Sequence, residues 1–164
     1  MQTSNLQRTE SKTAIVVYYT QFGNTEKIAR SLTAGLDKAG AKTTCVSTAG
    51  VRPDSLKDFD IIVLGAPTQA FSAAKPMKEF IESLGRVEGL SGKSFFAFDT
   101  KLPSHFSGSA AKYIESQLER MGLRVALPRS SAIGRGGEFK LDQGEEERFE
   151  KIGIELGTLL KGTE

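Results

Sequence analysis

The junction between a buried apolar run and a helical pattern, at residues 14–30 (AIVVYYTQFGNTEKIAR), most constrains the fold. The β-branched and aromatic run is typical of a buried strand, and the segment after the junction has the apolar spacing of an amphipathic helix. The junction itself, TQFGNT, is rich in hydroxyl, amide and glycine residues. A strand, a tight turn and a helix N-terminus together predict an anion-binding turn, because the first helical N–H groups have no intrahelical partner.

The residues of this turn indicate which anion it would bind. Thr20 and Thr25 add hydroxyl donors, and Gly23 lets the backbone approach an oxygen atom where a Cβ would intrude. The turn contains no lysine and matches neither GxxxxGK[ST] nor GxGxxG, which argues against nucleoside triphosphates and dinucleotides. Neutral donors suit a single phosphate monoester. The alternative is a strand-to-helix turn capped by Asn24 or Thr25, with no ligand.

Length and composition predict one globular domain. The 164 residues are 38% hydrophobic and 26% charged, which is typical of soluble proteins and sufficient to bury a core. Residues 1–12 are polar, so we expect a disordered tail and not a secretory signal, with the domain at residues 13–161. No apolar run reaches the length of a membrane span, and no membrane insertion is expected.

Charge and cysteine content narrow the function further. The formal net charge of +2, without a basic stripe, gives no indication of nucleic-acid binding. Cys45 is the single cysteine, so an internal disulfide is excluded, and no Cys/His cluster predicts a metal site. We expect Cys45 to be a small core residue and the protein to be cytoplasmic.

Strand and helix patterns alternate along the chain, which predicts an α/β domain with a parallel sheet. Strands are expected at residues 13–19, 42–47, 61–65, 94–99 and 123–133, the last interrupted at Pro128. Helices are expected at residues 26–39, 53–59, 75–84, 108–121 and 141–160. Five strands connected in this way fit a doubly wound, five-stranded parallel sheet of order 2-1-3-4-5, with helices on both faces. Ligands of such sheets bind at the carboxyl ends of the strands, near strands 1 and 3.

Two further loops at that edge have features of a ligand site. The loop after the third expected strand, GAPTQAF, has small residues that let a flat ring approach the backbone, followed by Phe71. The loop after the fourth, residues 99–109, is long and polar and ends in Ser-Gly-Ser, a helix-capping sequence with backbone donors. Asp99, at the end of that strand, is expected to orient the loop backbone.

The three loops resemble the flavin-binding loops of flavodoxins. TQFGNT is similar to the phosphate loop [ST]-x-[ST]-G-N-T, except that Phe22 replaces a hydroxyl residue. Some flavodoxin-like families, including the flavin domains of flavodiiron proteins and certain quinone reductases, carry an aromatic residue there. The segment GAPT followed by KPMKEF resembles the second loop, and the long polar loop resembles the third. The resemblance extends from Thr13 to about Leu160.

The resemblance implies a flavodoxin-like fold with FMN as the cofactor. It implies that Lys101 lies near the N1–O2 edge of the flavin, or is merely a solvated lysine, and that His105, the only histidine, modulates flavin protonation or is merely exposed. The usual stacking tyrosine of the third loop is missing, so that Leu102, His105 or Phe106 would replace it. The implied cofactor-binding residues are Thr20, Gln21, Phe22, Gly23, Asn24, Thr25, Pro67, Thr68, Gln69, Ala70, Phe71, Asp99, Thr100, Lys101, His105 and Phe106.

The implied function is electron transfer through the exposed edge of a non-covalent flavin, with redox proteins as partners and a monomer or weak dimer as the assembly. No catalytic side chain is needed, because the flavin supplies the redox chemistry. One alternative is an NAD(P)H- or quinone-linked FMN reductase of the same fold, favoured by Phe22 and the absence of an acidic surface. Another is a binding or regulatory module without flavin.

Overall fold

The computed structural model describes residues 11–162, which form a mostly parallel sheet between two helical layers. The sheet order is β2-β1-β3-β5-β7-β8, with β4 beside β3 and β6 beside β5. The parallel strands are β1 (Thr13–Tyr18), β2 (Lys42–Ser47), β3 (Ile61–Gln69), β5 (Ser94–Lys101), β6 (Arg124–Val125) and β7 (Ser130–Arg135). Two short strands, β4 (Ser72–Ala73) and β8 (Lys140–Leu141), pair antiparallel with β3 and β7.

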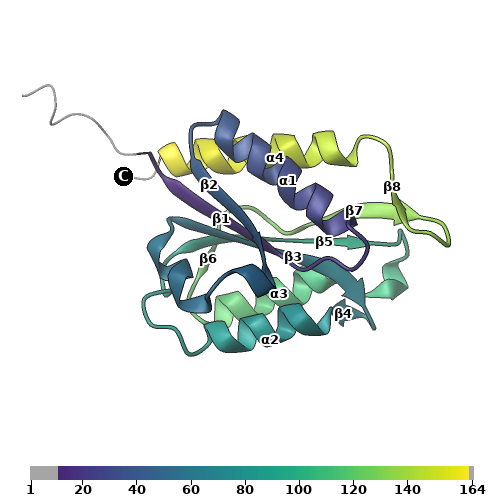
Figure 1. Cartoon of the computed structure of the whole chain (residues 1–164), viewed down its shortest axis with the longest axis horizontal. Coiled ribbons are helices and arrows are strands. Elements are labelled where there is room, and N and C mark those ends of the chain that lie inside the picture. The colour runs from purple at the N-terminus through teal and green to yellow at the C-terminus, as the bar shows by residue number, and fades with distance from the viewer. Residues whose placement is uncertain (1–10, 163–164) are drawn as a thin grey trace, which may run out of the picture.

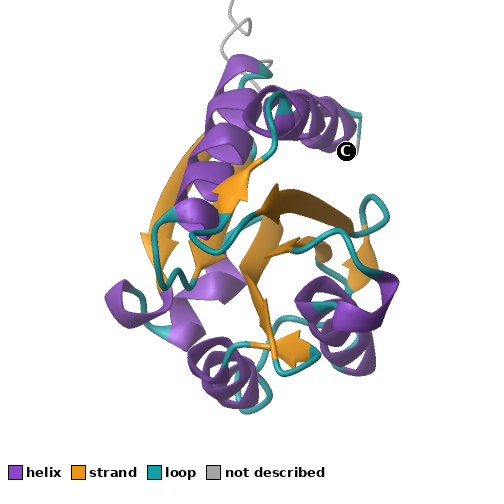
Figure 2. Cartoon of the chain, turned by 90° about the vertical axis from the view of Figure 1, so that its right-hand side faces the viewer, coloured by secondary structure: helices purple, strands orange, loops and turns teal. Residues whose placement is uncertain are grey.

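Within residues 11–162, four α-helices cover the two faces of the sheet, and helices lie on both faces in Figures 1 and 2. One face carries α1 (Asn24–Lys38) and α4 (Glu145–Lys161), and the other carries α2 (Lys75–Leu84) and α3 (Ala110–Arg120). Short 3-10 helices are η2 (Thr48–Gly50), η3 (Pro53–Asp58) and η4 (His105–Ser107). Within the described residues, no helix is long and apolar enough to cross a membrane.

The central strands are apolar throughout because helices cover both of their faces. In β1, Ile15 and Val17 belong to the same buried cluster as Met77 of α2, whereas the alternate residue Val16 belongs to the cluster that contains Leu32 of α1. These side chains are at most 1% exposed. Alternation along each strand therefore produces two separate cores, one under each helical layer.

The structure confirms the doubly wound α/β fold and the expected strand order, and it refines the element boundaries. The fifth expected strand is divided into β6 and β7 around Pro128, which has no N–H group to donate to a sheet. The expected helix at residues 141–160 begins only at Glu145, because Leu141 belongs to β8. Cys45 packs partly buried against the α1–α4 core, and burial raises the pKa of its thiol. Residues 1–10 of the expected tail lie outside the described residues.

The helices α1 and α4 contact each other at backbone distance. A Cβ on Gly35 of α1 would lie 2.0 Å from the carbonyl oxygen of Glu150, and one on Gly153 of α4 would lie 2.3 Å from that of Leu32. Only glycine allows this approach, because any larger side chain would push the helices apart. The contact holds α4 beside α1 along its middle turns.

The first turn of α4 is bound to β7 by a charged network. The carboxylate of Glu145 accepts hydrogen bonds from the Ile133 N–H at 2.8 Å and from Nε and Nη2 of Arg148 at 2.8 and 2.9 Å. Arg148 also donates to the Ser130 hydroxyl at 3.0 Å and the Ser131 carbonyl at 2.6 Å. Hydrogen bonding to Arg148 lowers the pKa of Glu145, despite partial burial. The network fixes the strand that leads into the β7–β8 hairpin.

This network predicts a pH-dependent contribution to stability. Because the pKa of Glu145 is lower in the folded state than in the unfolded state, its contribution is present above the ordinary glutamate pKa, about 4.3, and is lost as the pH falls through the lowered value. We expect Glu145→Gln to reduce the free energy of unfolding by about 1–2 kcal/mol at pH 7. Urea unfolding at pH 7, 5 and 3.5 should show this difference shrinking at the lowest pH.

A matched control is available in the same helix. The exposed Glu155 allows the same change, Glu155→Gln, which should alter the free energy of unfolding by less than about 0.5 kcal/mol at each pH. A difference between the wild type and Glu145→Gln that stays constant from pH 7 to 3.5 would contradict the assignment.

Candidate functional site

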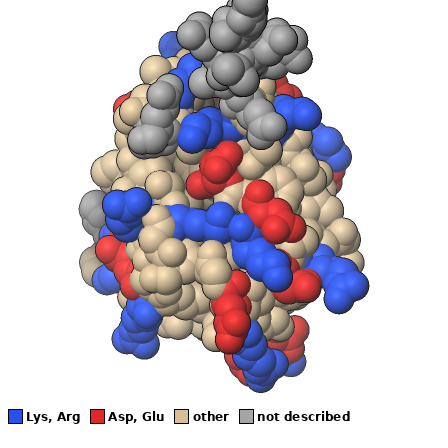
Figure 3. Space-filling model, turned by 90° about the vertical axis from the view of Figure 1, so that its left-hand side faces the viewer, with Lys and Arg blue, Asp and Glu red and all other residues tan. Residues whose placement is uncertain are grey.

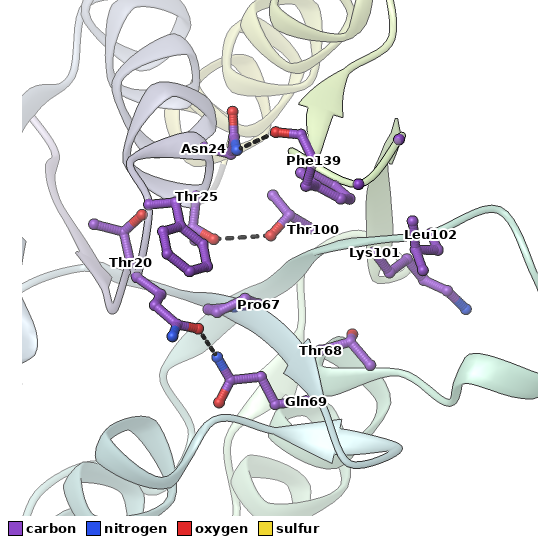
Figure 4. A pocket seen from close by; sticks show the side chains of 14 residues that line it. Thr20, Asn24, Thr25, Pro67, Thr68, Gln69, Thr100, Lys101, Leu102 and Phe139 are labelled. Carbon is purple, nitrogen blue, oxygen red and sulfur yellow. Dashed lines mark hydrogen bonds between the residues drawn. The ribbon is translucent and has the colours of Figure 1, made fainter.

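A cavity of about 290 Å³ lies at the carboxyl ends of β1, β3 and β5 (Figure 4). This is the edge at which ligands bind in doubly wound sheets. Its walls come from the β1–α1 turn, the ends of β3 and β5, and the turn of the β7–β8 hairpin. The lining residues are Thr20, Gln21, Phe22, Asn24, Thr25, Pro67, Thr68, Gln69, Thr100, Lys101, Leu102, Gly136, Gly137 and Phe139.

The β1–α1 turn places backbone N–H groups without intrahelical acceptors beside the cavity. Gly23 is the N-cap of α1 with φ +98°, a left-handed conformation that glycine adopts without strain, and no side chain caps this helix end. A Cβ at Gly23 would have no atom within 4 Å, so the turn faces open space. The N–H groups of Asn24, Thr25 and Glu26 lack intrahelical acceptors. A hydrogen bond within the turn stabilises it: the Gly23 N–H donates to Thr20 Oγ1 at 2.9 Å.

Two buried hydroxyl groups join this turn to β5. Thr25 Oγ1 and Thr100 Oγ1 lie 2.9 Å apart, and the two residues are 1% and 4% exposed (Figure 4). One hydroxyl proton occupies the bond between them, and the second hydroxyl proton is left to donate elsewhere. Both residues line the cavity, so a bound acceptor would satisfy that donor.

The end of β3 forms a second wall and connects to the first. Gln69 Nε2 donates to Gln21 Oε1 at 2.6 Å, which joins the two loops across the cavity (Figure 4). The next two residues turn sharply, with φ +49° at Ala70 and φ +70° at Phe71. This conformation is strained for residues other than glycine. It leaves the Phe71 side chain 73% exposed and outside the cavity lining.

Asp99 lies near the end of β5, which forms the third wall of the cavity, and its hydrogen bonds hold that wall in place. Its side chain is fully buried, and Oδ2 accepts hydrogen bonds from the Ala111 N–H at 3.0 Å, Ser109 Oγ at 2.7 Å and Thr68 Oγ1 at 3.2 Å. Thr68 in turn accepts the Ala110 N–H at 2.9 Å. Asp99 therefore connects the ends of β3 and β5 with the N-terminus of α3, in agreement with its expected role of orienting the loop.

The family model of flavodoxin matches residues 16–152. The chain belongs to the flavodoxin family. A solved flavodoxin from the domain Archaea has a TM-score of 0.77 and 25% identity, covering 91% of this chain and 99% of that one. Membership in this family implies a flavin cofactor and work with redox partners.

The chain is also similar to two curated proteins that are not named flavodoxins. An NAD(P)H dehydrogenase (quinone) of Archaeoglobus fulgidus is 24% identical over 156 residues, which cover 76% of this chain and 81% of that protein. A protein of Nostoc sp. named diflavin flavoprotein A 5 is 25% identical over 162 residues, covering 96% of this chain but 27% of its own length. The flavodoxin fold of this chain thus resembles both a free-standing protein and a part of a longer one.

The structure brings most of the expected cofactor-binding residues to the cavity, although their binding role stays a prediction. Gly23, Ala70, Phe71, Asp99 and Phe106 are outside the lining. The side chain of His105 lies outside the described residues. Leu102, considered as a replacement for the missing tyrosine, lines the cavity.

Sequence reasoning missed the contribution of the β7–β8 hairpin. Residues of its turn are not among the cofactor-binding residues expected from the sequence, but Gly136, Gly137 and Phe139 line the cavity. Asn24 Nδ2 donates to the Phe139 carbonyl at 3.0 Å, across 115 residues of sequence (Figure 4). The two adjacent glycines were the only local indication of a special turn.

The buried contacts of Asp99 predict a large effect on stability. Asp99→Ala would leave one buried donor and two partly buried donors without their acceptor, and we expect the free energy of unfolding to fall by about 2–4 kcal/mol. The exposed Asp58 provides the control, since Asp58→Ala should change it by less than about 0.5 kcal/mol. Urea unfolding followed by circular dichroism measures both, and equal midpoints for the two variants would contradict the supporting role of Asp99.

Proposed function

We propose that this flavodoxin-family chain binds FMN non-covalently and transfers electrons through an exposed edge of the flavin. The observation that carries the proposal is the uncapped N-terminus of α1, which opens into the cavity at the carboxyl edge of the sheet. The cavity, at about 290 Å³, lies near the lower end of the range for small-molecule sites, roughly 300–1,000 Å³. A ligand of this class would therefore extend partly beyond the cavity, as an exposed redox edge requires.

The residues at the β1–α1 turn fit a phosphate monoester. The N–H groups of the first turn of α1, which has no side-chain cap, and the hydroxyls of Thr20 and Thr25 are neutral donors, and Thr20, Asn24 and Thr25 line the cavity. Among the described lining residues, only Lys101 is basic, and it comes from the other side of the cavity. The FMN phosphate would thus be held by hydrogen bonds and the helix dipole.

The remaining walls fit the isoalloxazine ring. Pro67, Thr68 and Gln69 present backbone and small polar groups on one side, and Lys101 and Leu102 lie on the other. Bound FMN would supply the one- and two-electron chemistry, while the chain orients the ring and limits access of water. The positive charge of Lys101 would stabilise negative charge that develops on the ring during reduction.

The partner is expected to be another redox protein, met at the carboxyl edge of the sheet. Phe22, which is 80% exposed, lies at the cavity and offers an apolar contact there. At the opposite edge, basic and acidic side chains are interspersed (Figure 3), and the formal net charge is +2. A formal net charge of +2 gives no indication of a strongly acidic docking surface, so docking of that kind is not proposed for this chain.

A second candidate function is that of an NAD(P)H- or quinone-linked flavin reductase. It is favoured by the relative from Archaeoglobus fulgidus that is named an NAD(P)H dehydrogenase (quinone). The exposed Phe22 ring at the cavity would offer a stacking surface for an aromatic substrate. Consumption of NADH with a quinone, measured on the FMN-loaded protein, separates this candidate from a carrier that needs a protein partner.

The first test of the proposal is a visible absorption spectrum before and after addition of FMN and removal of the excess. Retained bands at roughly 370 and 450 nm would support FMN binding. A protein that retains no flavin under either condition would contradict it and would instead fit a binding module of the same fold.

The phosphate-binding role of the turn predicts a specific loss of affinity. Thr25→Val removes one hydroxyl donor and retains the backbone N–H, so we expect FMN to bind about three- to tenfold more weakly. Riboflavin, which lacks the phosphate, should bind with unchanged affinity. Thr33→Val is the matched control, because Thr33 lies two turns along the same helix and donates to the Ala29 carbonyl. Flavin fluorescence titrations measure the affinities, and equal effects of the two variants on FMN would contradict the assignment.

A further inference from the structure

The first turn of α3 differs from that of α1, because its N–H groups already have acceptors within the chain. The Ala110 N–H donates to Thr68 Oγ1 at 2.9 Å. The Ala111 N–H donates to Asp99 Oδ2 at 3.0 Å, and the next N–H group donates to Ser109, the N-cap residue, at 3.1 Å. No side chain caps α1. One helix N-terminus at this edge of the sheet is therefore open to a ligand, and the other is occupied by a carboxylate and two hydroxyl groups.

The hydrogen bonds at Asp99 favour its ionised form. Thr68 and Ser109 donate their hydroxyl protons to Asp99 Oδ2 at 3.2 and 2.7 Å, so that this oxygen accepts three hydrogen bonds with that of Ala111. The other oxygen, Oδ1, is buried and has no hydrogen-bond partner within residues 11–162. A proton placed on Oδ1 would be a buried donor without an acceptor, which is costly. Asp99 is therefore a fixed negative charge inside the protein.

This charge lies directly behind the lining of the cavity. Thr68, whose hydroxyl donates to Asp99, is a lining residue, and so is Thr100, the next residue along β5. Asp99 is fully buried, and charges act more strongly through a protein interior than through water. Lys101 also lines the cavity with the opposite charge, but it is only half-buried, so solvent screens it more. The buried acid thus dominates the electrostatics at this wall.

We propose that the buried carboxylate of Asp99 lowers the reduction potential of a flavin bound in this cavity. The inference rests on the proposed function, because it places the flavin ring against the wall that contains Thr68. Reduction adds electrons to the ring, and a fixed negative charge nearby opposes the negative charge that develops there. The N–H groups in the first turn of α3 are already bonded and do not compensate for it. Asp99 therefore weakens the binding of the reduced flavin more than that of the oxidised flavin.

The test compares the affinities of oxidised and reduced FMN for the full chain. Flavin fluorescence titration gives the oxidised affinity, and anaerobic reduction by dithionite beside a reference dye gives the potential, from which the reduced affinity follows. We expect the wild type to bind oxidised FMN more tightly than reduced FMN. Asp99→Asn removes the charge and keeps the size of the side chain, so it should bind reduced FMN about tenfold more tightly than the wild type does. That change corresponds to a rise of about 30 mV for a two-electron couple.

Two further variants separate the charge of Asp99 from its structural role. Glu138→Gln removes the same charge from an exposed residue between the lining residues Gly137 and Phe139, and it should change the affinity ratio by less than about twofold. Ser109→Ala removes a hydrogen bond to Asp99 but retains the charge, and it should also leave the ratio within about twofold of the wild type. Circular dichroism establishes that each variant is folded.

The outcomes distinguish this inference from the proposed function. An unchanged ratio in Asp99→Asn, or an equal shift in Ser109→Ala, would overturn the role of the charge alone. A wild type that binds reduced FMN as tightly as oxidised FMN would also overturn it, and that result does not depend on the folding of any variant. A wild type that binds neither form of FMN would overturn the proposed function together with this inference.

Discussion

The site depends on the in-register parallel pairing of the three central strands. Tyr18 of β1 lies opposite Gly65 of β3, which lies opposite Phe98 of β5, so the three strands end at the same edge of the sheet. The register requires a glycine at position 65, because a Cβ there would lie 2.0 Å from the Phe98 ring. That ring also contacts Phe149 of α4 edge-on, with centroids 6.1 Å apart. Core packing directly beneath the cavity therefore determines the relative positions of its loops.

Hydrogen bonds of buried polar side chains fix the positions of the loops relative to the core. Thr25 is bonded to Thr100, and Asp99 to Thr68 and to the N-terminus of α3, each pair from segments distant in the sequence. Buried polar groups are costly unless they are hydrogen-bonded, so each bond selects one loop arrangement over its competitors. The walls of the cavity are consequently preorganised, which lowers the entropy cost of binding a ligand.

Sequence reasoning succeeded where the information is local. Apolar patterns predicted the central strands, and the alternation of strands and helices fitted a doubly wound order of the sheet. The turn at Gly23 was predicted because a strand, a glycine and a helix follow one another directly. It failed where the arrangement depends on distant pairing. The contact between Asn24 and Phe139 joins residues 115 positions apart, and the spacing of apolar residues in the sequence does not indicate it. The outward direction of Phe71 follows from positive φ angles at two residues that are not glycine, which only the tertiary contacts can enforce.

The two ends of the cavity differ in how the chain holds them. At the α1 end, the turn is closed by hydrogen bonds to Thr20, Thr100 and Phe139. At the other end, the backbone of Phe71 is strained and is held by close packing against Gly108, where a Cβ would lie 2.2 Å from the Phe71 carbonyl oxygen. Strain of this kind persists only when the surrounding structure imposes it. The fold thus fixes one end by polar bonds and forces an aromatic side chain outward at the other.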